Sequence, residues 1–142
     1  MAGILALLAA LVLTVSVAWA YRVRNGRFGS TSSTQAQPDV LGVSDIGTQL
    51  GERATLVQFS SAFCSPCRAT RVLLADIASK VDGVVAVDID AEDNLDLVRR
   101  FGIMRTPTVL VLDAGGAVTT RASGLPRREQ VLAALGRAVE AS

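Results

Sequence analysis

The chain has 142 residues, half of them hydrophobic, and a formal net charge of +1. This length suits one folded domain with a core of its own. All 13 acidic residues lie from Asp39 onward, so the part from Asp39 carries 11 basic against 13 acidic residues. This near-neutral balance lacks the basic footprint that is typical of a nucleic-acid-binding protein.

The N-terminal stretch Ala2–Tyr21 contains twenty consecutive residues without a charge. As an α-helix this stretch would span about 30 Å, which is the hydrocarbon thickness of a bilayer. Trp19 and Tyr21 lie at its end, where aromatic side chains often meet the membrane interface. Segment 1–21 is therefore predicted to be a transmembrane anchor.

A cleavable signal peptide is the competing interpretation, because residues 18–20 (Ala-Trp-Ala) fit the small-x-small cleavage pattern. Against it, no Lys or Arg precedes the apolar run, and Arg22, Arg24 and Arg27 follow it at once. Since positive charge tends to stay on the cytoplasmic side, an uncleaved anchor with a cytoplasmic domain is predicted. An extracytoplasmic domain is the alternative.

Segment 22–38 is rich in Gly, Ser, Thr and Gln from Asn25 onward and shows no apolar periodicity. Such a composition cannot bury a core, so the segment is predicted to be a flexible linker. The linker would give a tethered domain its reach from the membrane, or it would be a passive spacer. The folded domain is expected to occupy 39–142.

The folded part alternates helical and strand patterns. A short helix is expected over Ser44–Leu50, with Ser44 as its N-cap. In chain order, the next predicted elements are a central strand Ala54–Ser61, a helix Ala69–Lys80, a buried strand Val84–Asp90, a helix Asn94–Phe101, a strand Thr108–Asp113, a turn Ala114–Gly116, a strand Ala117–Ser123 and a terminal helix Arg127–Ala141.

Two of these helices carry apolar stripes at helical spacing, which predicts their core-facing sides. The stripes consist of Ala69, Val72, Leu73 and Ile77 in the first helix and Val131, Leu132, Leu135 and Val139 in the last. Strands that alternate with helices pair in parallel through right-handed crossovers, and the final hairpin adds an antiparallel edge. The expected fold class is α/β, a small mixed sheet with helices on both faces.

The only two cysteines stand in the sequence Cys64-Ser65-Pro66-Cys67, between a predicted strand and a predicted helix. At a helix start, the first thiol lies near the positive end of the helix dipole and near free N–H groups, which favour the thiolate. Cys67 follows one turn later, close enough to form a short disulfide and release a covalent partner. Pro66 is tolerated in a first turn. The pattern predicts two-step thiol–disulfide chemistry.

A Cys-x-x-Cys pair can also be half of a zinc or iron–sulfur site, which normally needs four N or S ligands. The chain has no histidine and no third cysteine, so such a site would need a second copy or carboxylate ligands. Two inert buried thiols are a further alternative, although inert thiols rarely stand between a strand and a helix. No metal and no bound cofactor are predicted.

Taken together, the motifs and their spacing resemble the thioredoxin superfamily over 39–142. The residues that carry the resemblance are Phe59, Cys64-Ser65-Pro66-Cys67, Val87-Asp88-Ile89-Asp90, Arg105-Thr106-Pro107-Thr108, Gly115-Gly116 and Gly124. The resemblance implies a thioredoxin-like sheet and thiol–disulfide oxidoreductase activity. It also implies that protein thiols and disulfides are the partners, with a thioredoxin-reductase-like or membrane electron donor.

By this resemblance, Cys64 is the attacking and Cys67 the resolving cysteine. Pro107 corresponds to the family's cis-proline, and the backbone of Thr106 pairs with a bound peptide. Ser65 and Pro66 belong to the same substrate-binding surface. A trans-proline that begins an edge strand is the alternative interpretation of Pro107.

The chain departs from the family pattern at three places. Gln58 stands where a buried aspartate is typical, and Ala86 stands where its lysine partner is typical. Without that acid the resolving thiol must lose its proton to water or another group, which could slow release of a mixed disulfide. Ser60 and Phe63 replace the flanking tryptophans, and Ser65 replaces the glycine before the proline.

The sequence therefore predicts a membrane-anchored oxidoreductase that reduces protein disulfides. Two alternatives stay open: thiol maturation outside the membrane, of the cytochrome c assembly type, and a thioredoxin-fold adaptor that turns over poorly. Arg68, Arg71 and Arg105 are candidates for a basic rim near Cys64 that would favour acidic partners. The alternative interpretation is that these three residues are solvated surface arginines with no effect on Cys64.

Overall fold

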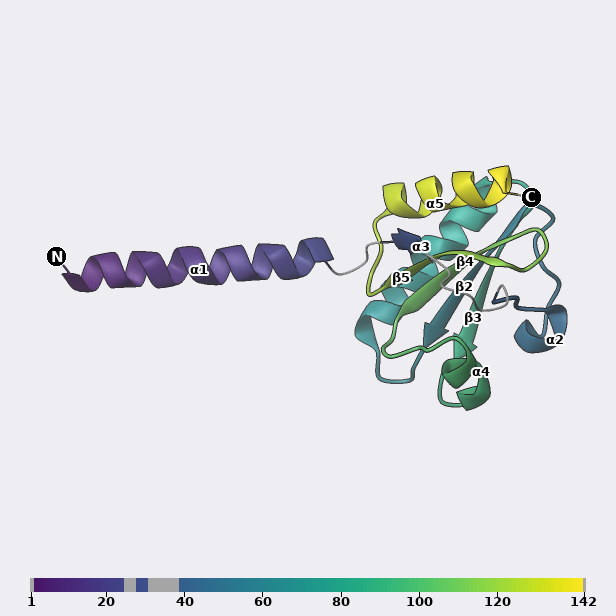
Figure 1. Ribbon diagram of the computed structural model, residues 1–142, viewed down its shortest axis with the longest axis horizontal. Coiled ribbons are helices and arrows are strands. Elements are labelled where there is room, and N and C mark those ends of the chain that lie inside the picture. Colours follow the sequence, from purple (N-terminus) through teal and green to yellow (C-terminus); the bar gives the residue numbers. More distant parts are fainter. Residues whose placement is uncertain (1, 25–27, 31–38, 142) are drawn as a thin grey trace.

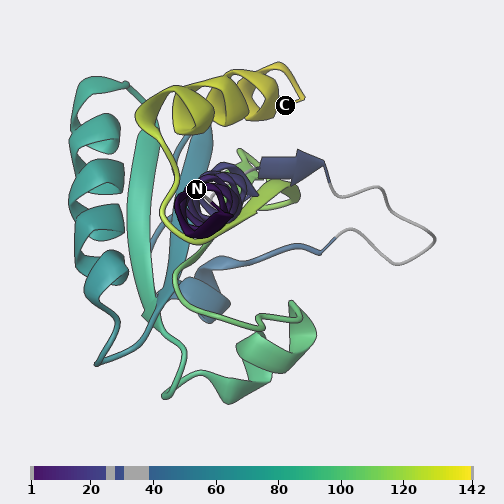
Figure 2. The same ribbon diagram turned by 90° about the vertical axis from the view of Figure 1, so that its left-hand side faces the viewer.

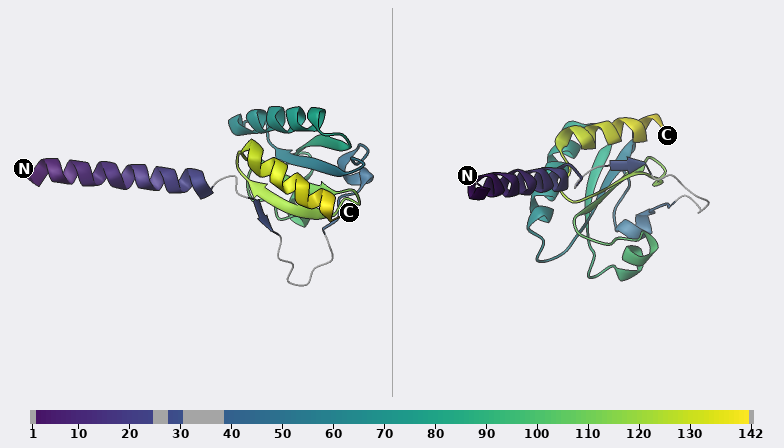
Figure 3. Two further views of the ribbon diagram at one scale, coloured as in Figure 1. Left: turned by 90° about the horizontal axis from the view of Figure 1, so that it is seen from above. Right: turned by 60° about the vertical axis from the view of Figure 1, so that its left-hand side comes forward.

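The computed structural model describes residues 2–24, 28–30 and 39–141. Helix α1 spans Ala2–Arg24, and Figures 1 and 3 show it extending away from the folded part. In the portion of the chain that the structure describes, no helix combines the length and apolarity needed to cross a membrane.

The segment expected to be a linker contains regular structure at two places. Helix α1 continues into it as far as Arg24, and strand β1 (Phe28–Ser30) pairs antiparallel with strand β5 (Val118–Ser123). The other positions of that segment, 25–27 and 31–38, lie outside the described residues. In the described part, the domain edge therefore includes three residues that lie before Asp39.

The remaining elements follow the predicted order closely. Helix α2 is shorter than expected and covers Val43–Ile46. Its N-cap is Gly42, and its C-cap is Gly47, which has a φ of 69°. The prediction of Ser44 as N-cap is wrong, because the Gly42 N–H donates to the Asp45 carboxylate at 2.9 Å. The other elements are β2 (Ala54–Ser60), α3 (Ser65–Lys80), β3 (Val84–Asp90), α4 (Leu95–Arg100), β4 (Thr108–Asp113) and α5 (Arg128–Glu140).

The described strands form one mixed sheet in the order β1-β5-β4-β2-β3. Strands β2 and β3 are parallel, as predicted, and β2 has a neighbour on each side. Strand β4, however, runs antiparallel to β2, which corrects the expectation of parallel pairing throughout. Helix α3 has 16 residues and can carry the chain back along the sheet, whereas the six residues of α4 span only about 9 Å. The chain therefore starts β4 near the end at which β3 stops.

Helices cover both faces of this sheet. Figure 2 shows α3 and α5 on one side and α4 on the other. Under α3 and α5 lies a cluster that includes Leu56, Leu74 and Val109, and on the opposite face lies a cluster that includes Phe59 and Phe101. Strand β2 contributes alternate side chains to both clusters, so it is buried along its whole length. Strand β3 ends the order of described strands and is less buried than predicted.

The core-facing side of α3 differs from the predicted stripe. The buried residues are Cys67, Thr70, Leu74 and Ile77, at spacings of three and four, whereas Val72 is 65% exposed. The helix begins at Ser65, and the side that carries Cys67 faces the sheet. In α5, Leu132 is exposed, and Ala134 and Ala138 are buried. Small side chains at these two positions let α5 approach the sheet closely.

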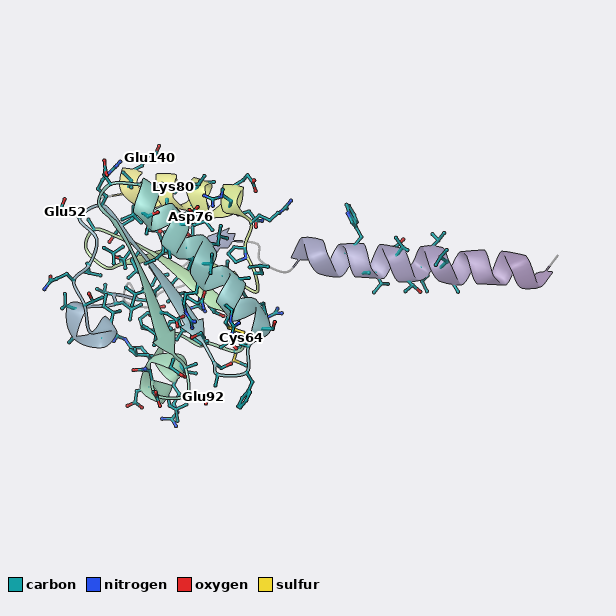
Figure 4. All side chains as sticks on the ribbon, turned by 180° about the vertical axis from the view of Figure 1, so that it is seen from behind. Glu52, Cys64, Asp76, Lys80, Glu92 and Glu140 are labelled. Atoms are coloured by element: carbon teal, nitrogen blue, oxygen red, sulfur yellow. A yellow bond between two sulfur atoms is a disulfide. The ribbon has the colours of Figure 1, made fainter. Side chains whose placement is uncertain are left out.

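Asp76 pairs with two cations, one on its own helix α3 and one on α5. Lys80 Nζ lies 2.8 Å from the carboxylate, and Arg128 of α5 also pairs with it. Figure 4 labels Asp76 and Lys80 on the part of α3 next to α5. Hydrogen bonds from Lys80 and Arg128 hold the pKa of Asp76 below its ordinary value of 3.8. The ionised carboxylate is therefore favoured in the folded state.

This lowered pKa leads to a pH-dependent prediction. Because the folded-state value lies below the unfolded one, the contribution of Asp76 is complete above pH 3.8 and is lost as pH falls further. Asp76→Asn should be slightly less stable than the wild type at pH 7, and the difference should shrink below pH 3.8. Thermal unfolding across pH checks this, with exposed Asp82→Asn as control. An equal deficit at pH 3 and pH 7 would contradict the assignment.

Candidate active site

The two cysteines form a disulfide between the C-terminal end of β2 and the start of α3 (Figure 4). Their Cα atoms are 5.3 Å apart. Cys64 is the N-cap of α3, and Pro66 lies in the first turn, as the sequence predicted. Cys64 is half-buried, whereas Cys67 is only 2% exposed. A group that approaches from solvent therefore meets the sulfur of Cys64 first.

This difference in burial leads to a prediction about the reduced protein. Iodoacetamide should modify Cys64 well before Cys67, because the side chain of Cys67 is closed off by the domain. Peptide mass spectrometry after short exposures measures the two rates separately. In denaturant the two rates should converge, which provides the control. Equal rates in the folded protein would show that Cys67 is as accessible as Cys64.

The loop before β4 lies against the loop after β2. The Thr106–Pro107 peptide bond is cis, as the resemblance implied. Ser61 Oγ and Thr106 Oγ1 are 3.0 Å apart, which brings Thr106 to the loop that carries Cys64. Pairing of β4 with its neighbours begins at Thr108, so the backbone of Thr106 stands outside the ladder. The structure thus places Thr106 beside the loop that carries Cys64, and Ser65 and Pro66 are exposed in the first turn of α3 that follows this loop.

Gln58 lies in the interior against the backbone of Cys67. Its side chain is 1% exposed, and Nε2 donates a hydrogen bond of 3.0 Å to the carbonyl oxygen of Cys67. A cavity of about 200 Å³ lies beside it, lined also by Ala86, Asp88 and Arg71. The acid and lysine that are typical of the family are thus replaced by an amide and an alanine.

Arg71 is held by an acid on the neighbouring strand. Its Nη2 lies 2.5 Å from Asp88 Oδ2, which also accepts a hydrogen bond of 3.0 Å from Ser60 Oγ. Asp88 therefore compensates the charge of Arg71, which removes Arg71 from the predicted basic rim. Within the described residues, no cluster of three or more His, Cys, Asp or Glu side chains could hold a metal ion.

Two large apolar side chains flank the site. Phe63 is fully exposed and Met104 is 91% exposed. Each lies two residues from the contact between Ser61 and Thr106. Sequence reasoning singled out Phe63 but missed Met104, although a large apolar residue directly before Arg105 was a usable signal. An exposed apolar residue alone is ordinary, but here two of them lie on loops that are in mutual contact.

Comparisons with known proteins agree with this geometry. The thioredoxin family model matches residues 45–136. The chain is 34% identical over 86 residues to a thioredoxin of Alicyclobacillus acidocaldarius subsp. acidocaldarius, covering 60% of this chain and 81% of that protein. It is 29% identical over 80 residues to a thioredoxin of Bacillus subtilis (strain 168), covering 56% and 77% respectively.

Solved structures show the same likeness. The crystal structure of chloroplastic thioredoxin z superposes with a TM-score of 0.55 at 26% identity, covering 64% of this chain and 81% of that chain. Spinach chloroplast thioredoxin f shares the fold, with a TM-score of 0.55 at 22% identity over 62% of this chain and 78% of that chain. Together with the disulfide at the start of α3, the family match leads to one conclusion: the chain belongs to the thioredoxin family and is a thiol–disulfide oxidoreductase.

Proposed function

We propose that this protein reduces disulfides in other proteins, with Cys64 as the attacking sulfur and Cys67 as the resolving sulfur. The observation that carries the proposal is the arrangement of the pair: a half-buried Cys64 at the N-cap of α3, with a buried Cys67 one turn behind it. Burial protects the second sulfur from outside reagents and leaves it within reach of the first.

The reaction proceeds in two exchanges. The thiolate of Cys64 attacks one sulfur of the substrate disulfide, that S–S bond breaks, and the other substrate sulfur leaves with the electron pair and takes up a proton. Cys67 then loses its proton, and its sulfur attacks the sulfur of Cys64. The second substrate sulfur leaves as a thiol, and the protein is left with the Cys64–Cys67 disulfide. Two electrons have passed to the substrate, which has also taken up two protons, one from Cys67 and one from solvent because Cys64 reacted as the thiolate.

The exposed surface around Cys64 supports a protein substrate. Phe63 and Met104 offer exposed apolar area two residues along the chain from Ser61 and Thr106, which are in contact. The backbone of Thr106 lies outside the β4 ladder, so it can pair with an extended segment next to the substrate disulfide. In this proposal Ser65 and Pro66 border the same segment.

A trapping experiment tests the proposal. Cys67→Ser keeps the first exchange and blocks the second, so substrates should accumulate as mixed disulfides on Cys64. The control is the double variant Cys64→Ser/Cys67→Ser, which has no sulfur and should trap nothing. Partners released by dithiothreitol are identified by mass spectrometry. If Cys67→Ser traps no more than the double variant, the domain is an adaptor and does not reduce protein disulfides.

We further propose that segment 1–21 anchors the domain to a membrane, with the domain on the cytoplasmic side. The support is the uncharged run Ala2–Tyr21, which is followed directly by Arg22, Arg24 and Arg27. Electrons would come from a thioredoxin-reductase-like or membrane donor on that side.

Membrane fractionation with carbonate washing tests the anchor, because an integral protein stays in the pellet. A membrane-impermeant thiol reagent on intact cells then tests the side, after reduction with a permeant thiol. Cys64 should be labelled only after lysis. Labelling without lysis would place the domain outside and favour thiol maturation of the cytochrome c assembly type. If carbonate washing releases the protein from the membrane pellet, the proposal of a transmembrane anchor is wrong.

A further inference from the structure

Gln58 is a buried amide with one satisfied and one unsatisfied end. Nε2 donates to the carbonyl oxygen of Cys67 at 3.0 Å. Oε1 is closed to solvent and has no hydrogen-bond partner among the described residues. The orientation of the amide follows from chemistry, since a carbonyl oxygen only accepts and must therefore face the NH₂ group. The unsatisfied atom is thus an acceptor next to the backbone of Cys67.

The redox state of Cys67 determines whether a thiol donor exists on the residue that Gln58 contacts. An unsatisfied buried acceptor is costly and rare, which calls for a specific reason at this position. The sulfur of Cys67 is bonded to Cys64 in this structure and carries no proton. Reduction adds two electrons and two protons, and one proton then resides on Cys67 Sγ. That S–H group is a new donor on the residue whose carbonyl oxygen already accepts a hydrogen bond from Gln58.

We propose that Gln58 is a positioning residue that favours the reduced protein, because Oε1 accepts a hydrogen bond from the Cys67 thiol after reduction. The oxidised state leaves the acceptor unsatisfied, and the reduced state satisfies it. The redox equilibrium therefore shifts toward the dithiol, which makes the disulfide easier to reduce. The same bond holds the proton on Cys67, so it also delays the second exchange. This inference depends on the redox activity of the cysteine pair and on no particular substrate.

The redox equilibrium with glutathione tests the proposal on the full chain. Two glutathione molecules reduce the Cys64–Cys67 disulfide and become one glutathione disulfide. Gln58→Met removes both the donor and the acceptor at similar volume, so the equilibrium constant for reduction should fall about fivefold or more. Thr55→Val is the matched control. It removes another buried polar side chain from β2, one that accepts a hydrogen bond from the N–H of Gly51, and it should leave the constant unchanged.

Thermal unfolding separates this role from a purely structural one. Loss of the bond from Nε2 to Cys67 affects both redox states, whereas loss of the acceptor affects them differently. Gln58→Met should therefore lower the melting temperature of the reduced form more than that of the oxidised form. Equal shifts in the two forms, together with an unchanged equilibrium constant, would overturn the proposal and leave Gln58 only as a support for the Cys67 backbone.

An infrared measurement keeps the proposal testable even if Gln58→Met does not fold. Cys64→Ser leaves a single S–H group in the chain, that of Cys67. A hydrogen bond to Oε1 should lower the wavenumber of the S–H stretching band relative to that of a free thiol in an apolar solvent. A band at the free-thiol position would overturn the proposal. Failure of substrate trapping would leave these results intact, so the two proposals fail separately.

Discussion

Cys64→Ser is expected to reduce insulin-disulfide turnover by this protein to the rate of dithiothreitol alone. A serine hydroxyl forms neither a nucleophilic thiolate at neutral pH nor a disulfide, so both exchanges stop. The turbidity of precipitating insulin B chain gives the rate. Ser79→Ala, an exposed change near the far end of α3, should keep the wild-type rate. Turnover that survives in Cys64→Ser would exclude this sulfur as the attacking group.

Cys67→Ser should stop multiple turnover and still permit one attack. In a single-turnover experiment the variant should form a mixed disulfide with the substrate, whereas the wild type should release its product. The physical reason is the position of Cys67, which is buried one turn behind Cys64 and is reached by no outside thiol. Because Gln58 replaces the family's acid, the mixed disulfide of the wild type should itself be detectable at early times.

Phe59→Ala is expected to destabilise the domain by about 3–5 kcal/mol, which is the usual effect of removing a buried phenylalanine. Phe59 is completely buried on β2 and lies in the cluster with Ile89, Leu97 and Phe101. Since the free energy of unfolding of small domains is about 5–15 kcal/mol, this loss removes a large part of the total stability. Urea denaturation with a constant m-value measures the change.

Two further variants serve as a surface control and as a milder core substitution for comparison with Phe59→Ala. Val72→Ala should change stability by no more than about 0.5 kcal/mol, because the side chain of Val72 is 65% exposed. Ile89→Val, in the same cluster as Phe59, should lower the free energy of unfolding by about 0.5–1.5 kcal/mol. This milder variant still tests the packing of the cluster if the Phe59→Ala protein does not fold. A loss for Val72→Ala as large as that for Phe59→Ala would contradict the observed packing of α3.

The effect of Phe59→Ala should extend to the active site. Phe59 lies on the same strand as Gln58 and five residues before Cys64, so a cavity at this position loosens the end of β2 that carries the cysteine loop. Disulfide reductase activity should therefore fall at temperatures where the variant is still folded. Val72→Ala should leave activity unchanged, because that side chain faces solvent near the middle of α3.

The sequence alone was sufficient for the chemistry and for most of the secondary structure. Cys64 and Cys67 are the only cysteines, and both their spacing and their position between a strand and a helix are local features of the chain. Strand β4 was predicted to its exact bounds, because an uninterrupted apolar run between a proline and a glycine turn is also a local signal. Local signals of this kind depend only on residues that are close together in the sequence.

The tertiary structure decided which residues meet. The contact of Ser61 with Thr106 joins residues 45 positions apart, and the reversed direction of β4 depends on the short length of α4. The orientation of Gln58 toward the Cys67 carbonyl and the exposure of Met104 also required the packed domain. Periodicity identifies an apolar side of a helix or strand, but the packing of distant elements determines which side is covered. That is why Val72, predicted to lie in the core, faces solvent.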